Sequence, residues 1–179
     1  MTMFEVRLHG RGGQGVVTAA ELLSVAAFRD GFEAQAFPSF GSERMGAPVI
    51  SFCRVSDEPI RVREPVTRPD AVVVDATLLH HVDLFAGLSP DGYVLINSSR
   101  PPDDLGLGDL MTGLPPGRVV TIPATDLARQ HVGRPMPNIC MLGALAGLSA
   151  TVSMSSIESA VRDRFGAGVA EANNRAAWA

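Results

Sequence analysis

The chain has 179 residues, 46% of them hydrophobic, and a formal net charge of −4. This length and apolar content predict a single domain over residues 1–179 that buries a sizeable core, and the negative charge argues against nucleic acid or an anionic membrane as a partner. All fifteen basic residues are arginine, which excludes Schiff-base chemistry and a lysine-dependent phosphate loop. The first residues do not resemble a secretory signal and the longest apolar runs are too short to span a membrane, so we expect a cytoplasmic protein.

The first predicted elements are a strand over residues 3–8, a glycine-rich turn over residues 10–15 and an apolar helix over residues 16–28. Glycines let a ligand approach the backbone closely, and a helix start presents unpaired N–H groups and the positive end of its dipole. An arginine within such a turn is placed to pair with a phosphate or with a carboxylate of a partner. We therefore expect a phosphate-bearing ligand to bind the six turn residues, which are Gly10, Arg11, Gly12, Gly13, Gln14 and Gly15.

The turn also has the G-x-G-x-x-G spacing of dinucleotide-binding proteins, through Gly10, Gly12 and Gly15. In those proteins an acidic residue about 20 positions further on, at the end of the second strand, holds the ribose. Here the second predicted strand, residues 33–36, has its only carboxylate at its start, on Glu33. A phosphate ligand other than NAD is therefore favoured. The alternative is that the glycines only allow close packing of strand and helix.

Further strands are predicted at residues 49–55, 60–63, 71–75, 93–97 and 118–122. The first two of these flank a turn sequence at residues 56–59 and indicate a hairpin, which would bring antiparallel pairing into the sheet. Residues 71–74 and 93–96 are continuous apolar runs, typical of central strands covered on both faces. The sequence therefore predicts an α/β protein, a three-layer α/β/α Rossmann-like sandwich with a mixed sheet.

The C-terminal part of the chain is predicted to be helical, with helices near residues 126–131, 139–148, 157–164 and 169–178. Ser155 and Glu158 have the S-x-x-E spacing of a capping box, which predicts a helix start at Ser155. Residues 139–148 are apolar on every side. Such a helix must be buried, either inside this domain or against another chain.

Few residues suggest chemistry. Cys53 and Cys140 are the only cysteines, so thiols of this chain cannot build an iron–sulfur cluster or a zinc site. The four histidines form no recognisable nucleophilic array with serines. Asp75 ends a predicted central strand, where ligands of open α/β sheets bind, but it could equally cap the helix that follows. We expect no catalytic residue and no metal ligand in this chain.

A long loop over residues 37–48 carries aromatic and methionine side chains next to a Glu-Arg pair. These residue types indicate a surface that a ligand or partner orders. The candidate contact residues are Phe40, Gly41, Glu43, Arg44 and Met45. The alternative is that Phe37 and Phe40 fill the core of the domain and that Arg44 is solvated.

The turn and the loop together resemble the gamma subunit, or gamma domain, of pyruvate and other 2-oxoacid:ferredoxin oxidoreductases. The resemblance rests on residues 9–23, 36–41, 43–44 and 46–49 in this order and spacing, and extends to residues 59–61, 69–70, 133–135, Asn138 and 141–144. Met45 is a departure, because the pyruvate-type branch usually has a second arginine at this position.

The resemblance implies an accessory subunit of a complex that oxidatively decarboxylates a 2-oxoacid to an acyl-CoA and passes the electrons to ferredoxin or another acceptor. It implies that this chain helps to bind coenzyme A and to assemble the complex. It also implies that thiamine diphosphate, magnesium and [4Fe-4S] clusters lie on alpha, beta and delta-type subunits, so the isolated chain should be inactive. The alternative is a freestanding Rossmann-like nucleotide-binding oxidoreductase domain.

Overall fold

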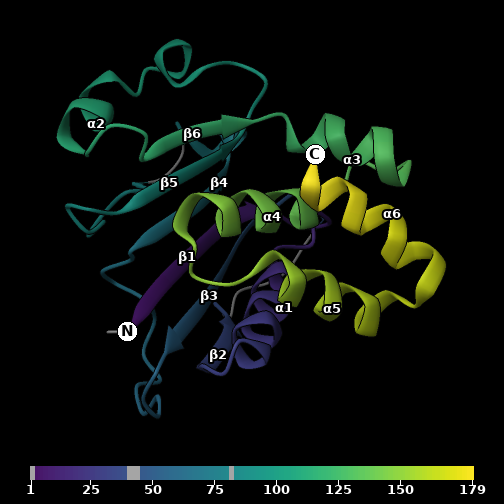
Figure 1. The fold of residues 1–179 in the computed structure, drawn as a ribbon. Helices are drawn as coiled ribbons and strands as arrows, with labels where there is room; N and C mark the ends of the chain where they lie inside the picture. The colour runs from purple at the N-terminus through teal and green to yellow at the C-terminus, as the bar shows by residue number, and fades with distance from the viewer. Residues whose placement is uncertain (1–2, 40–44, 81–82) are drawn as a thin grey trace.

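The computed structural model describes residues 3–39, 45–80 and 83–179. In these residues six strands form one sheet, flanked by helices on both faces (Figure 1). The strands are β1 (Phe4–Arg11), β2 (Glu33–Pro38), β3 (Pro48–Ser56), β4 (Ala71–Asp75), β5 (Tyr93–Asn97) and β6 (Val119–Ile122). The α-helices are α1 (Val16–Arg29), α2 (Gly108–Gly113), α3 (Ala124–Val132), α4 (Asn138–Ser149), α5 (Met154–Phe165) and α6 (Ala167–Trp178), and two short 3-10 helices are η1 (Ala76–Leu78) and η2 (Pro102–Leu105).

The sheet has the strand order β2-β3-β1-β4-β5-β6. Strands β1, β4, β5 and β6 run parallel, whereas β3 runs antiparallel to both β1 and β2. All five residues of β4 are buried, as its continuous apolar run predicts for a strand covered on both faces. The predicted mixed sheet and the α/β class are confirmed.

The predicted hairpin is wrong. Residues 60–63 form no strand, and Arg61, Val62 and Arg63 are exposed. The physical reason is that β1 and β2 already occupy both edges of β3, so no edge is left for a returning strand. The antiparallel pairs in the sheet come from β3 with these two strands instead.

Two apolar layers sandwich the sheet. Helices α1, α3, α4, α5 and α6 pack on one face, and the segment with η1, η2 and α2 covers the other face over β4 and β5 (Figure 1). Most of α4 is buried inside this domain, which decides between the two alternatives for residues 139–148. Within the described residues, no helix is long and apolar enough to cross a membrane.

The start of α5 differs from the predicted capping box. Ser153, not Ser155, is the N-cap, and its hydroxyl accepts a hydrogen bond from the backbone N–H of Ser156. Asp30, just after α1, accepts hydrogen bonds from the N–H and hydroxyl of Ser153 and from the hydroxyl of Ser156. Asp30 and Ser153 are 123 residues apart in sequence. Their contact favours the earlier helix start because it satisfies polar groups at the N-terminal end of α5.

The chain leaves β1 and β4 toward opposite faces of the sheet. After β1 it enters α1, whose Leu23 lies in the core on one face, and after β4 it enters η1, whose Leu78 lies in the core on the other. The carboxyl ends of these neighbouring parallel strands therefore form a topological switch point. In open α/β sheets such a point is the usual place of a ligand crevice.

Candidate functional site

The glycine-rich turn lies at this switch point, between the end of β1 and the start of α1. Gly13 and Gly15 have φ values of 94° and 75°, in the left-handed region that glycine adopts readily. Gly15 is the N-cap of α1 and offers no side chain to cap it. The first bond at this end of the helix runs from the N–H of Ala19 to the carbonyl of Gly15, at 2.9 Å. The N–H groups before it have no partner within the helix and are available to a ligand.

A groove of about 620 Å³ runs along this end of α1. We call it the amide groove. The glycine turn and the first turn of α1 contribute backbone amides to its lining, and Met45, Met136 and Phe165 contribute apolar side chains. Its lining residues are Arg11, Gly12, Gly13, Gly15, Val16, Val17, Thr18, Met45, Val49, Met136, Asn138 and Phe165. Met45 is 88% exposed, so an occupant of the groove would remove apolar surface from water.

Part of the turn is occupied by the protein itself. The N–H of Arg11 donates to the side-chain oxygen Oε1 of Gln14 at 2.7 Å. The N–H of Gly12 donates to the carbonyl of Ala47 at 2.8 Å, and the N–H of Gly46 donates to the carbonyl of Gly12 at 3.0 Å. Residues 45–47, which we call the strap, are thus tied to the turn. Among the described residues, the amides at the start of α1 have no such partner and are left for an anion.

The Arg11 guanidinium also contacts the protein. Its Nε donates to the hydroxyl of Thr77 at 2.7 Å, Nη1 to the carbonyl of Gly46 at 3.0 Å and Nη2 to the carbonyl of Thr77 at 3.2 Å. The side chain is only partly buried, and these acceptors are neutral. Its positive charge therefore lies beside the amide groove, held in place by three hydrogen bonds.

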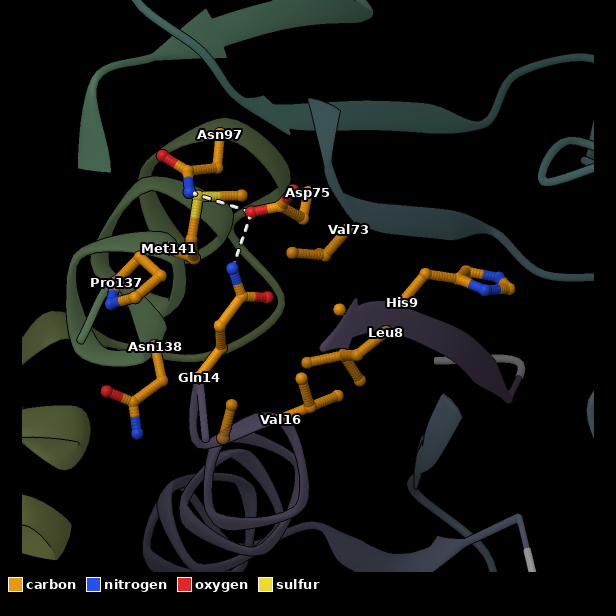
Figure 2. A pocket seen from close by; sticks show the side chains of 12 residues that line it. Leu8, His9, Gln14, Val16, Val73, Asp75, Asn97, Pro137, Asn138 and Met141 are labelled. Carbon is orange, nitrogen blue, oxygen red and sulfur yellow. Dashed lines mark hydrogen bonds between the residues drawn. The ribbon is translucent and has the colours of Figure 1, made fainter. Parts of the chain in front are cut away.

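Asp75 lies opposite the turn, at the end of β4 (Figure 2). Its Oδ1 accepts from the N–H and the hydroxyl of Thr77, at 3.0 and 2.6 Å, so it caps η1. Its Oδ2 accepts from Nε2 of Gln14 at 2.7 Å and from Nδ2 of Asn97 at 3.3 Å. The sequence left open whether Asp75 caps the helix that follows or lies where ligands of open α/β sheets bind. In the structure Asp75 caps η1 and also lies at the switch point.

Sequence reasoning missed Asn97 and Thr125. The Asn97 side chain, at the end of β5, also donates to the hydroxyl of Thr125 at 2.8 Å and accepts from its N–H at 3.1 Å. It thereby joins the first turn of α3 to the network around Asp75. The sequence did contain one indication of Asn97. This residue ends a predicted parallel strand, as Asp75 ends the predicted strand before it.

A small cavity of about 40 Å³ is lined by Gln14, Asp75 and other residues of β1, β4, β5, α1 and α4 (Figure 2). Oδ1 of Asn138, which belongs to its lining, is buried without a hydrogen-bond partner in the described structure. Nε2 of His9 is also buried without a partner, but the His9 ring points away from the cavity (Figure 2). Burial, together with the charge of Arg7, lowers the pKa of His9 to about 4. His9 is therefore neutral at pH 7. The cavity has room for a few water molecules.

The remaining candidates divide into two groups. Four of the five candidate contact residues of the loop lie outside the described residues: Phe40, Gly41, Glu43 and Arg44. Met45 is the one candidate of this loop that the structure describes. Phe37 is half-buried and packs on Phe52 with ring centroids 5.1 Å apart.

The thiols and other possible metal ligands do not form a metal site in the part of the chain that the structure describes. Cys53 and Cys140 are both buried. Burial raises the pKa of Cys53 to about 12 and that of Cys140 to about 11. Because thiolates are the species that bind clusters and zinc, these residues do not fit such ligands.

Comparison with known proteins gives the family. The family model described as pyruvate ferredoxin/flavodoxin oxidoreductase matches residues 5–179. Pyruvate synthase subunit PorC of Methanothermobacter thermautotrophicus is 48% identical over 98% of this chain and 92% of that protein. The pyruvate/ketoisovalerate oxidoreductases common subunit gamma of Thermococcus kodakarensis is 43% identical over 98% of this chain and 94% of that protein.

Solved structures agree. Pyruvate oxidoreductase subunit PORC from Thermotoga maritima has a TM-score of 0.82 and 36% identity, covering 99% of this chain and 94% of that one. The same fold occurs in 2-oxoglutarate:ferredoxin oxidoreductase from Magnetococcus marinus, solved with 2-oxoglutarate, coenzyme A and succinyl-CoA bound, at a TM-score of 0.76 and 20% identity over 98% of this chain and 30% of that one. The chain therefore belongs to the pyruvate ferredoxin/flavodoxin oxidoreductase family, as a gamma-type subunit of a 2-oxoacid:ferredoxin oxidoreductase.

Proposed function

We propose that this subunit contributes the amide groove to coenzyme A binding in a cytoplasmic complex that converts a 2-oxoacid to an acyl-CoA. The observation that carries the proposal is the pairing, in one groove, of uncapped helix amides with exposed methionine side chains. Coenzyme A also combines two such parts, because its phosphates are anionic and its pantetheine arm is uncharged. The amides and the Arg11 charge would bind phosphate oxygens, and Met45 and Met136 would cover the arm.

The wider family supports this ligand. The Magnetococcus marinus protein, which shares the fold, is described with coenzyme A and succinyl-CoA bound. A freestanding nucleotide-binding domain is not favoured, because the similarity to subunits of multi-subunit enzymes runs over 98% of this chain.

The rest of the reaction would belong to the partner subunits. In the enzyme, thiamine diphosphate with magnesium supplies the decarboxylation chemistry and [4Fe-4S] clusters carry electrons toward ferredoxin or another acceptor. The buried, protonated thiols of Cys53 and Cys140 do not suit cluster binding. The described residues of this chain would hold coenzyme A, orient it and contact the alpha, beta and delta-type subunits.

A charge placed at the groove tests the proposal. Thr18, in the first turn of α1, lines the amide groove. Thr18→Glu adds a carboxylate that suits the helix dipole but repels a phosphate, and Thr18→Gln has the same size without the charge. In the enzyme assembled with its partner subunits, we expect the glutamate variant to raise the KM for coenzyme A about tenfold, which corresponds to roughly 1.4 kcal/mol. The glutamine variant should stay close to wild type.

The first half of the reaction provides the internal control. Reduction of the clusters by the 2-oxoacid, measured before coenzyme A is added, should be equal in both variants and in wild type. Equal KM values for coenzyme A in the two variants would overturn the proposal, because the added charge would then be remote from the bound phosphates.

A further inference from the structure

Four residues at the switch point form a closed ring of hydrogen bonds. The N–H of Arg11 donates to Gln14, whose Nε2 donates to Asp75. The hydroxyl of Thr77 donates to the other oxygen of Asp75 and accepts from Nε of Arg11, which closes the ring. All four bonds measure 2.6 or 2.7 Å. We call these residues, Arg11, Gln14, Asp75 and Thr77, the Asp75 ring.

The ring requires an ionised carboxylate at Asp75. This side chain is 8% exposed and accepts four hydrogen bonds, two on each oxygen, without donating any. An amide has only one acceptor oxygen, so it would turn an NH₂ group toward donors on one side. Charge-assisted bonds of this kind are also stronger than neutral ones.

The ring is connected to the amide groove through the strap. Arg11 holds the carbonyl of Gly46, and Gly12 exchanges backbone hydrogen bonds with Gly46 and Ala47. Met45, at the start of the strap, lies so close to the turn that a β-carbon on Gly13 would be 2.6 Å from its sulfur. The position of one wall of the groove thus depends on the side chains of the Asp75 ring.

We propose that Asp75 is a positioning residue for the ligand of the amide groove, acting through Gln14 and Arg11 rather than by contact. The inference rests on the proposed coenzyme A function of this groove. The ring holds the turn and the strap in the bound geometry before the ligand arrives, so that binding does not have to order them. Loss of the ring should therefore raise the KM for coenzyme A and leave kcat nearly unchanged.

An exchange of partners tests the inference. In Asp75→Asn the Gln14 amide meets another amide group, and in Gln14→Glu two carboxylates face each other. In the double variant Gln14→Glu/Asp75→Asn, the new amide at position 75 can donate to the new carboxylate at position 14, which still accepts from Arg11. Only the 3.3 Å contact from Asn97 is lost.

In the assembled enzyme, each single variant should raise the KM for coenzyme A about five- to tenfold, the scale of one ordinary hydrogen bond, with kcat within about twofold of wild type. The double variant should return the KM to within about twofold of wild type, since the two sites interact. Asp70→Asn is the matched control. Asp70 lies just before β4, at the opposite end of this strand, and binds the N–H of Glu5, so its replacement should leave the KM unchanged.

Hydrogen exchange separates the two proposals. The amides of Gly12 and Gly46 should exchange faster in Asp75→Asn than in wild type, and the double variant should restore their protection. Unchanged exchange in the single variant, or a double variant that restores neither exchange nor KM, would overturn the inference. Faster exchange with an unchanged KM would also overturn it if Thr18→Glu does raise the KM. If Thr18→Glu is equally without effect, the coenzyme A proposal itself has failed.

Discussion

Gly143 in α4 packs directly against the backbone of Ala177 in α6. A β-carbon on Gly143 would lie 2.0 Å from the carbonyl oxygen of Ala177, a distance that only a shift of one helix could relieve. Gly147, one turn further along α4, has open space around the same position. The two glycines of one helix are therefore not equivalent, and the first allows α4 and α6 to approach closely.

Gly143→Ala should destabilise the protein, because the added methyl group meets backbone rather than a flexible side chain. We expect a loss of about 1–3 kcal/mol, the usual range for overpacking, measured by urea unfolding of the full chain. Gly147→Ala is the control and should be neutral or stabilising by up to about 1 kcal/mol, since alanine is the better helix former. A Gly143→Ala protein as stable as the Gly147→Ala protein would show that α6 is not held at this distance.

Asp30 should stabilise the start of α5 in a pH-dependent way. Partial burial by itself would raise the pKa of Asp30, but hydrogen bonds from Ser156 and Ser153 outweigh it and lower the pKa below its usual value. The carboxylate therefore contributes stability at neutral pH, and this contribution is lost as the pH falls below about 4 toward the lowered pKa.

Asp30→Ala should cost about 1–2 kcal/mol at pH 7, and the difference from wild type should shrink as unfolding is measured at lower pH. Asp163→Ala is the comparison. Asp163 pairs with Arg29 at an exposed position, where ion pairs contribute at most about 1 kcal/mol. A difference between Asp30→Ala and wild type that stays constant down to pH 3 would contradict the role given to the ionised carboxylate.

His9 should make the protein less stable in mild acid. Its pKa in the folded state is lowered to about 4 by burial and by Arg7, whereas an unfolded histidine titrates near about 6.5. Between these values the unfolded chain binds a proton that the folded chain does not, so the free energy of unfolding falls as the pH falls from about 6.5 to 4. This group alone accounts for up to roughly 3 kcal/mol.

The measurement is urea unfolding of wild type and His9→Leu across this range. The variant should lack the part of the pH dependence that His9 contributes, and the ring signals of His9 in NMR should stay those of neutral imidazole down to about pH 5. Parallel stability curves for the two proteins would show that His9 protonates freely in the fold.

Met45→Asp should release the subunit from its complex without unfolding it. Met45 is 88% exposed in the isolated chain, and a charge buried without a partner at a subunit interface is costly. Val62, also exposed, follows β3 at the other end of the sheet, and Val62→Asp is the control. Copurification with the partner subunits should fail for the first variant and succeed for the second, with equal unfolding midpoints. Phe40, the other candidate in this loop, lies outside the described residues.

The local features of this protein could be predicted from the sequence. The alternation of strand and helix, the glycine turn before α1, the fully buried strand β4 and the buried centre of β5 all follow from short-range patterns of apolar residues and glycines. The family resemblance came from the same short segments. These features can be predicted from the sequence because each depends on residues that are neighbours in the chain.

The errors concern choices between partners that are distant in sequence. Residues 60–63 have the composition of a strand, but only the strand order shows that β1 and β2 already pair with β3. Ser155 and Ser153 are both suitable caps, and a carboxylate that is 123 residues away from Ser153 selects the latter. In the site, the sequence indicated Arg11 and Asp75 separately, since nothing local relates a turn after β1 to the end of β4.

The sequence by itself therefore determined most of the helices and strands, the apolar layers and the glycine turn before α1. The tertiary structure alone decided which amides remain available, where the Arg11 charge is held and how Gln14 and Asp75 meet across 61 residues of chain. The physical reason is that backbone conformation and burial follow local side-chain chemistry, whereas a hydrogen bond between two strand ends exists only after β4 has paired with β1.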